Sequence, residues 1–401
     1  MNIFKKLYCR IFQGVFRLAL PLLPYREPKL LDSNHGVAKV LKEKSIKNVL
    51  LVTDKGIRGL GLTKTLEDEL SKNNIIVSIY DETVPNPTSK NVDDAVALYH
   101  QNNCEAIIAF GGGSPIDCAK ATGAKIAYPN KPLSKMKGVL KVTKKIPLLI
   151  AVPTTAGTGS ETTLAAVITD SETRHKYAIN SFPLIPSYAL LDEKLTVGLP
   201  KHITATTGLD ALTHAVEAYI GRSTTKQTRQ KALSAIRAIF ENLPIAYEDG
   251  NNLAARKNML KAAFDAGIAF TKSYVGYVHA IAHSLGGKYN TAHGLANAII
   301  LPYMLKSYGK CIHKKLWEMG VYANLFDKET PIDDGAQIFI SKLEELNKKL
   351  NIPSSLPEIK REDIPTLART AEHEANPLYP VPKLYTAKQL ETIYHQISTR
   401  S

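Results

Sequence analysis

The stretch Glu105-Ala-Ile-Ile-Ala-Phe110-Gly111-Gly112-Gly113-Ser114-Pro115-Ile116-Asp117 joins an apolar run to three consecutive glycines. The run before the glycines predicts a buried strand, and the residues after them predict a helix. Because glycines have no side chains, such a turn lets a pyrophosphate approach backbone N–H groups at the start of a helix, where the helix dipole favours an anion. A glycine-rich turn alone is weak evidence for a nucleotide, and this one is not the GxGxxG fingerprint.

The residues after the glycines are those expected at a helix start. We expect Ser114 to be the N-cap, Pro115 the first helical residue, and Asp117 the acid that completes an arrangement like a capping box. Because this order suits any helix start, it supports the helix and not a particular ligand.

The segments on either side of the glycine turn alternate between strands and helices. We predict strands at 48–53, 75–80, 105–110 and 147–152, and helices at 62–71 and 91–102. This rhythm predicts an α/β domain with a parallel sheet and crossover helices. Ligands of such sheets bind outside the carboxyl ends of the strands, where Asp54, the Asn86-Pro87 turn and the glycines lie. Asp54 could also be only the start of a turn.

A second loop of small hydroxylic residues follows the predicted strand at 147–152. It reads Pro153-Thr154-Thr155-Ala156-Gly157-Thr158-Gly159-Ser160-Glu161, and two such loops can face one ligand. Extended segments follow at 164–169, 176–180 and 188–191. After residue 198 the apolar spacing is helical to the end, which predicts an all-helical second domain with long helices at 228–240, 253–270 and 336–350.

Three histidines lie close together in this second domain, in His279-Ala-Ile-Ala-His283-Ser-Leu-Gly286-Gly287-Lys-Tyr-Asn-Thr-Ala-His293-Gly294. On a helix His279 and His283 share one face, and a break at Gly286-Gly287 would let His293 return to the same point. A lone histidine is more often a packed or surface residue than a metal ligand. Three together, with a second polar cluster upstream, indicate a metal site.

The upstream cluster is Gly208-Leu209-Asp210-Ala-Leu-Thr-His214-Ala-Val-Glu217. Asp210 and His214 share a face of an otherwise apolar helix, for which Thr206 or Thr207 with Gly208 could supply the cap. Alone, the pair could be an ordinary hydrogen bond between aspartate and histidine. Together with the downstream histidines, a ligand set of carboxylate and imidazoles is the better explanation.

Residues 1–20 predict a basic amphipathic helix, with apolar residues at helical spacing and no acid before Glu27. Peripheral contact with an anionic membrane, or targeting, is one interpretation. Packing on its own domain or on a neighbouring subunit is about equally favoured. The chain has no apolar run of the length that a membrane span needs.

The net charge of +14 does not indicate a nucleic-acid partner, because half of the excess lies in residues 1–50 and the rest is spread thinly without interleaved aromatic residues. The four cysteines are far apart and form no CxxC pair. This pattern predicts reduced thiols and a cytoplasmic protein.

Four motifs together resemble the iron-containing (group III) alcohol dehydrogenases: GGGSPID at 111–117, PTTAGTGSE at 153–161, DALTH at 210–214 and HAIAHSLGGKYNTAHG at 279–294. Their order and separations are similar to the family over roughly residues 30–390. The basic amphipathic extension at 1–28 lies outside the resemblance. The family fold implies an NAD-binding α/β domain followed by a helical metal-binding domain, which agrees with the boundary near residue 198, so we expect these domains at 29–197 and 198–401.

The resemblance also implies roles for single residues. The metal ligands would be Asp210, His214, His279 and His293, and His283 would lie near the nicotinamide as a proton relay. The residues that match NAD contacts of the family are Asn86, Gly112, Gly113, Ser114, Asp117, Thr154, Thr155, Thr158, Ser160 and Lys176. Asp54 matches an acid that accepts the adenosine ribose hydroxyls, and its charge would repel a 2′-phosphate, which favours NAD over NADP.

The implied reaction transfers a hydride between a small primary or secondary alcohol and NAD, with a divalent metal acting as Lewis acid on the substrate oxygen. The family name implies Fe2+, although the same ligands suit Zn2+ or another divalent metal nearly as well. We also expect a homo-oligomer, in the simplest case a homodimer.

Three alternatives compete with this interpretation. A lyase resembling dehydroquinate synthase would need several cations for phosphate and carboxylate, whereas only Lys272 and Lys288 lie near the metal motifs. A glycerol or glycerol-phosphate dehydrogenase of the same architecture is related. A surface-attached binding protein with a vestigial site would have damaged ligands, whereas all four positions are intact.

Overall fold

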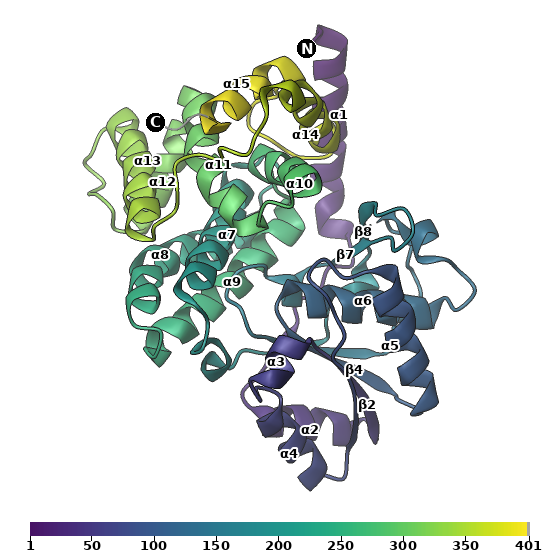
Figure 1. The fold of residues 1–401 in the computed structure, drawn as a ribbon. Helices are drawn as coiled ribbons and strands as arrows, with labels where there is room; N and C mark the ends of the chain where they lie inside the picture. The colour runs from purple at the N-terminus through teal and green to yellow at the C-terminus, as the bar shows by residue number, and fades with distance from the viewer. Residues whose placement is uncertain (399–401) are drawn as a thin grey trace. The chain divides into compact units, whose positions relative to one another are not determined.

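The structure, a computed structural model, describes residues 1–398 and divides into two compact units. Pro24–Val197 form the first unit, and Met1–Leu23 join the chain from Gly198 onward in the second. Figure 1 shows the first unit in purple to teal and most of the second in green to yellow, with the purple helix α1 belonging to the second.

The first unit contains a six-stranded sheet in which every neighbouring pair of strands is parallel. In sheet order the strands are β1 (Lys29–Leu31), β9 (Tyr188–Leu190), β6 (Leu148–Pro153), β4 (Ala106–Gly111), β2 (Asn48–Val52) and β3 (Ile76–Tyr80). The predicted α/β fold with a parallel sheet is confirmed.

Helices cover both faces of this sheet. Successive side chains of β4 point to opposite faces, and both faces are buried, which explains why the strand contains only apolar residues and glycine. Ile107 packs in the apolar cluster with α5 (Ser89–Gln101) and α6 (Gly113–Ala127). Ile108 points to the other cluster, with α2 (Asn34–Glu43) and α4 (Lys64–Lys72). A strand that is buried on both faces needs a continuous apolar run and not an alternating one.

The predicted extended segments at 164–169 and 176–180 lie outside the main sheet. They form β7 (Ala165–Thr169) and β8 (Lys176–Asn180), an antiparallel pair that continues to β5 (Gly138–Val139) in a three-stranded sheet. The segment predicted at 188–191 instead joins the main sheet as β9.

The predicted start of α6, with Ser114 as its N-cap and Asp117 completing a capping box, is wrong. Gly112 is the N-cap and Gly113 the first helical residue, so Ser114 and Pro115 lie inside the first turn and no side chain caps the helix. The glycines allow this earlier start because Gly111 adopts φ 151°, which disfavours any residue with a Cβ. Proline fits the first turn because its missing N–H would have no partner within the helix there.

The described part of the second unit contains helices and no strand, as predicted. They are α1 (Ile3–Ala19), α7 (Lys201–Ile220), α8 (Lys226–Glu248), α9 (Leu253–Ser273), α10 (Tyr277–Tyr289), α11 (His293–Tyr308), α12 (His313–Tyr322), α13 (Ile332–Lys349), α14 (Ile364–Ala375) and α15 (Ala387–Ser398). Helix α7 is central to the unit, because every residue from Gly208 to Ile220 is buried.

The predicted cap of α7 is wrong, because the helix begins at Lys201 after Pro200. Thr206 and Thr207 lie inside it and donate their hydroxyls to carbonyl oxygens one turn back. Gly208 is needed for packing instead, since a Cβ there would stand 2.5 Å from the side chain of Leu243 on α8.

The predicted break at Gly286-Gly287 is also wrong. Helix α10 continues through both glycines to Tyr289, and the chain turns at Asn290, which has φ 55°. Glycine inside a helix costs only about 1 kcal/mol, whereas asparagine is among the few residues that adopt the left-handed conformation readily. Among residues 1–398, no helix has the length and apolar character needed to cross a bilayer.

Candidate active site

Asp210, His214, His279 and His293 lie together in the second unit. Their ligand atoms are all within 4.8 Å of one another, and the first three residues are buried. Asp210 and His214 stand one turn apart on α7, His279 lies on α10, and His293 is the first residue of α11. The structure therefore brings together the four residues that the resemblance implied as metal ligands and leaves His283 outside the group.

The short connection after α10 and the glycine after His293 make this convergence possible. The left-handed turn at Asn290 reverses the chain within a few residues. Gly294 then lets α11 approach α7, because a Cβ at this position would stand 2.4 Å from the carbonyl oxygen of Thr206. On α7, His214 is stacked between the rings of Phe270 and His279, at centroid distances of 4.0 Å and 4.5 Å.

A buried carboxylate, Glu217, holds His279 from behind. One oxygen of Glu217 is 2.6 Å from His279 Nδ1 and accepts the N–H of Gly276, and the other accepts the N–H of Val278. Burial raises the pKa of Glu217 to about 7, but the two backbone donors fit its charged form. Both oxygens are therefore acceptors, which places the proton on His279 Nδ1.

With its Nδ1 proton held by Glu217, His279 presents a lone pair on Nε2. This nitrogen is buried and has no hydrogen-bond partner among the described residues. Burial, and then the neighbouring His214 and His293, hold the pKa of His279 well below its usual range. A neutral imidazole with a carboxylate behind it is the usual arrangement of a histidine metal ligand, so the cluster fits a divalent ion.

Asn297 connects two of the four clustered residues, Asp210 and His293. Its Nδ2 donates to Asp210 Oδ1 at 2.7 Å and lies 3.1 Å from His293 Nε2. Since the Nε2 of His293 is also 3.5 Å from Asp210 Oδ1, the amide keeps both ligand atoms in the same small volume.

His283 lies at the border of the cluster, with its ring centroid 5.1 Å from that of His293. Its Nδ1 is 2.6 Å from Glu374 on α14, which also accepts the hydroxyl of Tyr379. Burial of Glu374 opposes its charged form, but His283 and the hydrogen bonds outweigh this and lower the pKa of Glu374. The pair is thus a partly exposed histidine with a charged partner, an arrangement suited to proton transfer.

In the first unit the glycine loop and the hydroxylic loop lie side by side. The N–H of Thr154 donates to the carbonyl of Gly111, and a Cβ on Gly113 would stand 3.1 Å from the side chain of Thr158. Thr155 flanks Gly112 in the same way. The two loops therefore form one surface at the carboxyl ends of β4 and β6.

Asp117 and Ser160 lie beneath that surface and bind each other. Asp117 accepts the hydroxyl of Ser160 at 2.8 Å and the N–H of Val167 at 3.1 Å. The fully buried Lys120 donates to Ser160, to Thr163 and to a carbonyl of the following chain. Burial lowers the pKa of Lys120 to about 8, although the nearby carboxylates of Asp117 and Glu161 oppose this.

The remaining predicted cofactor residues lie in the same unit, Asp54 and Asn86 outside the helices and strands and Lys176 at the start of β8. Asp54 follows β2 and caps the short helix α3 (Lys55–Gly59), accepting the N–H of Ile57. Lys176 donates to the side chain of Asn86 at 2.7 Å, and Asn86 has φ 57°, as expected of a tight turn. Their predicted roles toward NAD stay predictions.

Four supporting residues were missed by the sequence reasoning: Glu217, Asn297, Glu374 and Lys120. Spacing could have revealed the first two, because Glu217 follows Asp210 by two helical turns and Asn297 follows His293 by one. Glu374 is 91 residues from His283, and no local pattern connects them.

Comparison with known proteins agrees with these observations. Residues 32–193 match the family described as iron-containing alcohol dehydrogenase, and residues 204–398 match the Fe-containing alcohol dehydrogenase family, C-terminal. The 1,3-propanediol dehydrogenase of Klebsiella pneumoniae is 38% identical over 355 residues, which cover 87% of this chain and 91% of that protein. The NAD-dependent methanol dehydrogenase of Bacillus methanolicus is 35% identical over 339 residues, covering 82% and 87%.

A crystal structure of a 1,3-propanediol oxidoreductase superimposes with a TM-score of 0.89 at 35% identity, covering 93% of this chain and 99% of that one. Fold, ligand cluster and relatives define a metal-dependent oxidoreductase of alcohols. The chain belongs to the iron-containing alcohol dehydrogenase family, as the four sequence motifs implied.

Replacing Gly294 by alanine should lower the free energy of unfolding by roughly 1–3 kcal/mol, because the new Cβ would overlap the backbone of α7 at Thr206. Chemical denaturation of the purified variant measures this. The control is Gly287→Ala in α10, where a Cβ meets nothing within 4 Å and should stabilise the helix by about 0.5–1 kcal/mol. Equal stabilities of the two variants would contradict the close approach of α11 to α7.

Proposed function

We propose that this protein is an NAD-linked alcohol dehydrogenase that interconverts small primary or secondary alcohols with the corresponding aldehydes or ketones, using one divalent metal ion. The observation that carries the proposal is the convergence of one carboxylate and three imidazoles within 4.8 Å in a chain of this family. The family name supports Fe2+ as the ion, while a donor set of this kind also suits Zn2+.

In this proposal Asp210, His214, His279 and His293 hold the metal, which supplies Lewis-acid chemistry toward the substrate oxygen when it is bound. Glu217 keeps the lone pair of His279 directed at the cluster. Because most of the cluster is buried, bulk water is kept from it, which strengthens electrostatic interactions there.

His283 has a separate role in the proposal, the transfer of the substrate proton. Its Nδ1 is held by Glu374, so Nε2 is the atom that takes up and releases a proton. Its side chain is 44% exposed, which gives that proton a route to solvent.

For NAD, the proposal assigns the pyrophosphate to the surface formed by the two loops of the first unit. Gly112, Gly113 and Ser114 would contact it from the start of α6, and Thr154, Thr155 and Thr158 from the second loop. Asp117 and Ser160 would act from below by holding that loop. Lys176 and Asn86 would contact the cofactor as a linked pair, and the printed name of the methanol dehydrogenase relative supports NAD as the nucleotide.

A neutral substrate is favoured over a phosphorylated or acidic one. The two lysines near the metal motifs are engaged elsewhere, Lys272 with Gln227 and Lys288 with Asp363. This argues against the lyase and the glycerol-phosphate alternatives. The names of the relatives, a propanediol dehydrogenase and a methanol dehydrogenase, support a small alcohol.

We further propose a cytoplasmic location and a homodimer. The four cysteines are free, and three of them are buried, as expected for a reducing compartment. Both edges of the main sheet expose large apolar side chains, Leu30 on β1 and Ile76 on β3, which leaves surface that a second copy could cover.

The purified protein should contain about one divalent ion per chain and should reduce NAD with short alcohols or diols. Metal analysis measures the first and NADH absorbance the second, in a panel that also includes aldehydes with NADH. Removal of the ion by a chelator should abolish turnover, and Fe2+ or Zn2+ should restore it. Full turnover by a metal-free protein would refute the proposed function.

Glu217→Gln should weaken metal binding by about 10–100-fold, because a neutral glutamine has only one oxygen for the three donors that Glu217 accepts and interacts less strongly with the Nδ1 proton of His279. Competition with a chromogenic chelator measures the affinity without reference to activity. Asp265→Asn is the matched control, since Asp265 is another buried carboxylate of this unit and pairs with Lys231 and Lys261. Equal affinities in the two variants would show that Glu217 is merely structural.

Asp54→Asn should reduce the preference for NAD over NADP, because it removes the charge but keeps an acceptor for the N–H of Ile57. The ratio of kcat/KM for the two nucleotides measures the preference. Asp54→Ala also removes the cap of α3 and should cost about 1 kcal/mol in addition. An unchanged ratio in Asp54→Asn would leave this residue with only its capping role.

A further inference from the structure

Helix α1 faces its own unit with a side that buries Cys9 together with the polar residue Gln13, while most of its apolar residues are exposed. Gln13 is buried and donates to the carbonyl of Tyr379 at 2.7 Å. One turn earlier, Arg10 donates to the carbonyls of Val381 and Pro382 at 2.8 Å and 2.9 Å. A helix on the surface of a protein normally buries its apolar side and exposes its polar side, so this orientation is reversed.

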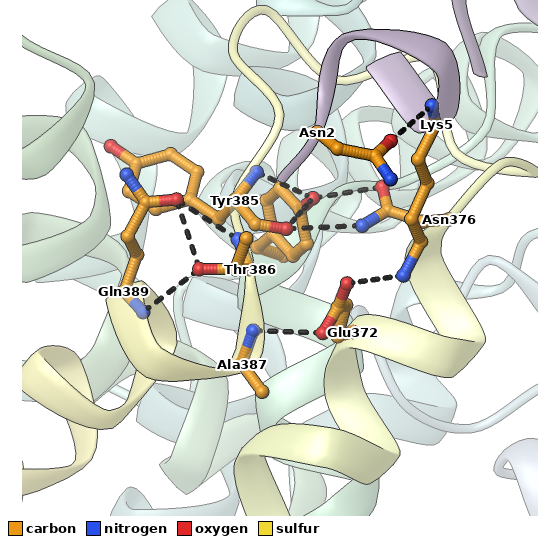
Figure 2. Close-up of polar contacts among 9 residues, drawn as sticks. Asn2, Lys5, Glu372, Asn376, Tyr385, Thr386, Ala387 and Gln389 are labelled. Atoms are coloured by element: carbon orange, nitrogen blue, oxygen red, sulfur yellow. Dashed lines mark hydrogen bonds and ion pairs between the residues drawn. The ribbon is translucent and has the colours of Figure 1, made fainter. Parts of the chain in front are cut away.

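Contacts near both ends keep α1 in this orientation. At its start, Asn2 caps the helix and Lys5 forms an ion pair of 2.7 Å with Glu372 on α14 (Figure 2). Glu372 also accepts the N–H of Ala387 at the start of α15, as Figure 2 shows. Toward its end, the ring of Phe16 packs edge-on against Tyr274 at 5.2 Å.

The opposite side of α1 is apolar and exposed. Phe4 and Leu18 are each 79% exposed, and the intervening positions at helical spacing are exposed as well. This exposed face consists of Ile3, Phe4, Leu7, Tyr8, Ile11, Val15 and Leu18. Contiguous apolar patches of this kind mark surfaces that bind a partner or a membrane.

Basic residues border the exposed face. Lys6 and Arg17 lie at its edge and are exposed, and residues 1–26 contain no acid. Arg17 also lines a depression of about 540 Å³ together with Arg222, Arg229, Lys314 and Lys315, where Glu318 is the only acid among the described lining residues. Burial lowers the pKa of Lys315 to about 8, and of its neighbours Glu318 opposes this while Arg229, Arg222 and Arg17 add to it.

We propose that the exposed face of α1 binds the surface of a bilayer that contains anionic phospholipids. Its apolar side chains would enter the boundary between headgroups and acyl chains, and the basic depression beside Arg17 would contact lipid phosphates. The inference is independent of the dehydrogenase chemistry, because α1 lies outside the residues that match the family.

A second copy of the chain is the other occupant to consider for this face, and charge argues against it. A symmetric interface brings the same patch of both copies together. Because residues 1–26 contain only basic charges, Lys6 and Arg17 of each copy would meet cations of the other. An anionic bilayer instead complements both the apolar face and its basic border.

The test is flotation of the full-length protein with vesicles of phosphatidylcholine, with and without phosphatidylglycerol. Binding should require phosphatidylglycerol and should weaken as salt is added, because the basic contacts are screened. The variant Leu7→Ser/Ile11→Ser should bind at least about tenfold more weakly. The matched control is Ile245→Ser/Leu253→Ser, which also replaces one exposed isoleucine and one exposed leucine, in α8 and α9 and not in α1.

Turnover and the unfolding transition are measured for every variant, to check that each one is folded. Absence of binding to phosphatidylglycerol vesicles, or equal binding to neutral vesicles, would overturn the proposal. Equal weakening in the two double variants would overturn it too. If the unaltered protein binds no vesicles but self-associates in sedimentation, and Leu7→Ser/Ile11→Ser does not self-associate, the exposed face binds a second copy instead.

Discussion

The hydrogen bonds of Glu217 are the constraint on which the candidate metal site depends. This buried carboxylate lies on α7, and its two oxygens accept the N–H of Gly276, the N-cap of α10, the N–H of Val278 in its first turn, and the Nδ1 proton of His279. Because α7 also carries Asp210 and His214, one side chain sets how three of the four candidate ligands face one another. An isolated buried charge would be strongly unfavourable, so these donors make the observed arrangement of α7 and α10 a specific one.

The first unit solves a similar problem with a buried cation. Its two candidate cofactor loops consist mainly of glycine, serine and threonine, which have too few side-chain atoms to pack a loop in place. Lys120 and Asp117 supply the missing contacts through Ser160, Thr163 and the backbone of the following strand. The loop surface is left small and polar, as the close approach of a phosphate requires.

Much of the fold and the site could be predicted from the sequence because local spacing encodes them. The i and i+4 positions of Asp210 and His214 and the strand before Gly111 are visible in the order of residues. The start of α6 and the end of α10 were misplaced because glycine and asparagine permit turns without fixing their position, as at Gly112 and Asn290. The periodicity of α1 predicts an amphipathic helix, but only tertiary contacts show which side is docked. Glu374 was not predictable, since its contact with His283 spans 91 residues.

Helix α14 carries two contacts that the chain separates widely. Glu372 holds the start of α1, and two residues further on Glu374 holds His283. Both carboxylates lie in the last turn and a half of the helix, which ends at Ala375. Local opening of this segment would release both at once, because helices unfold most readily from their ends. The anchoring of the amino terminus and the orientation of the candidate proton relay therefore share one unit of local stability.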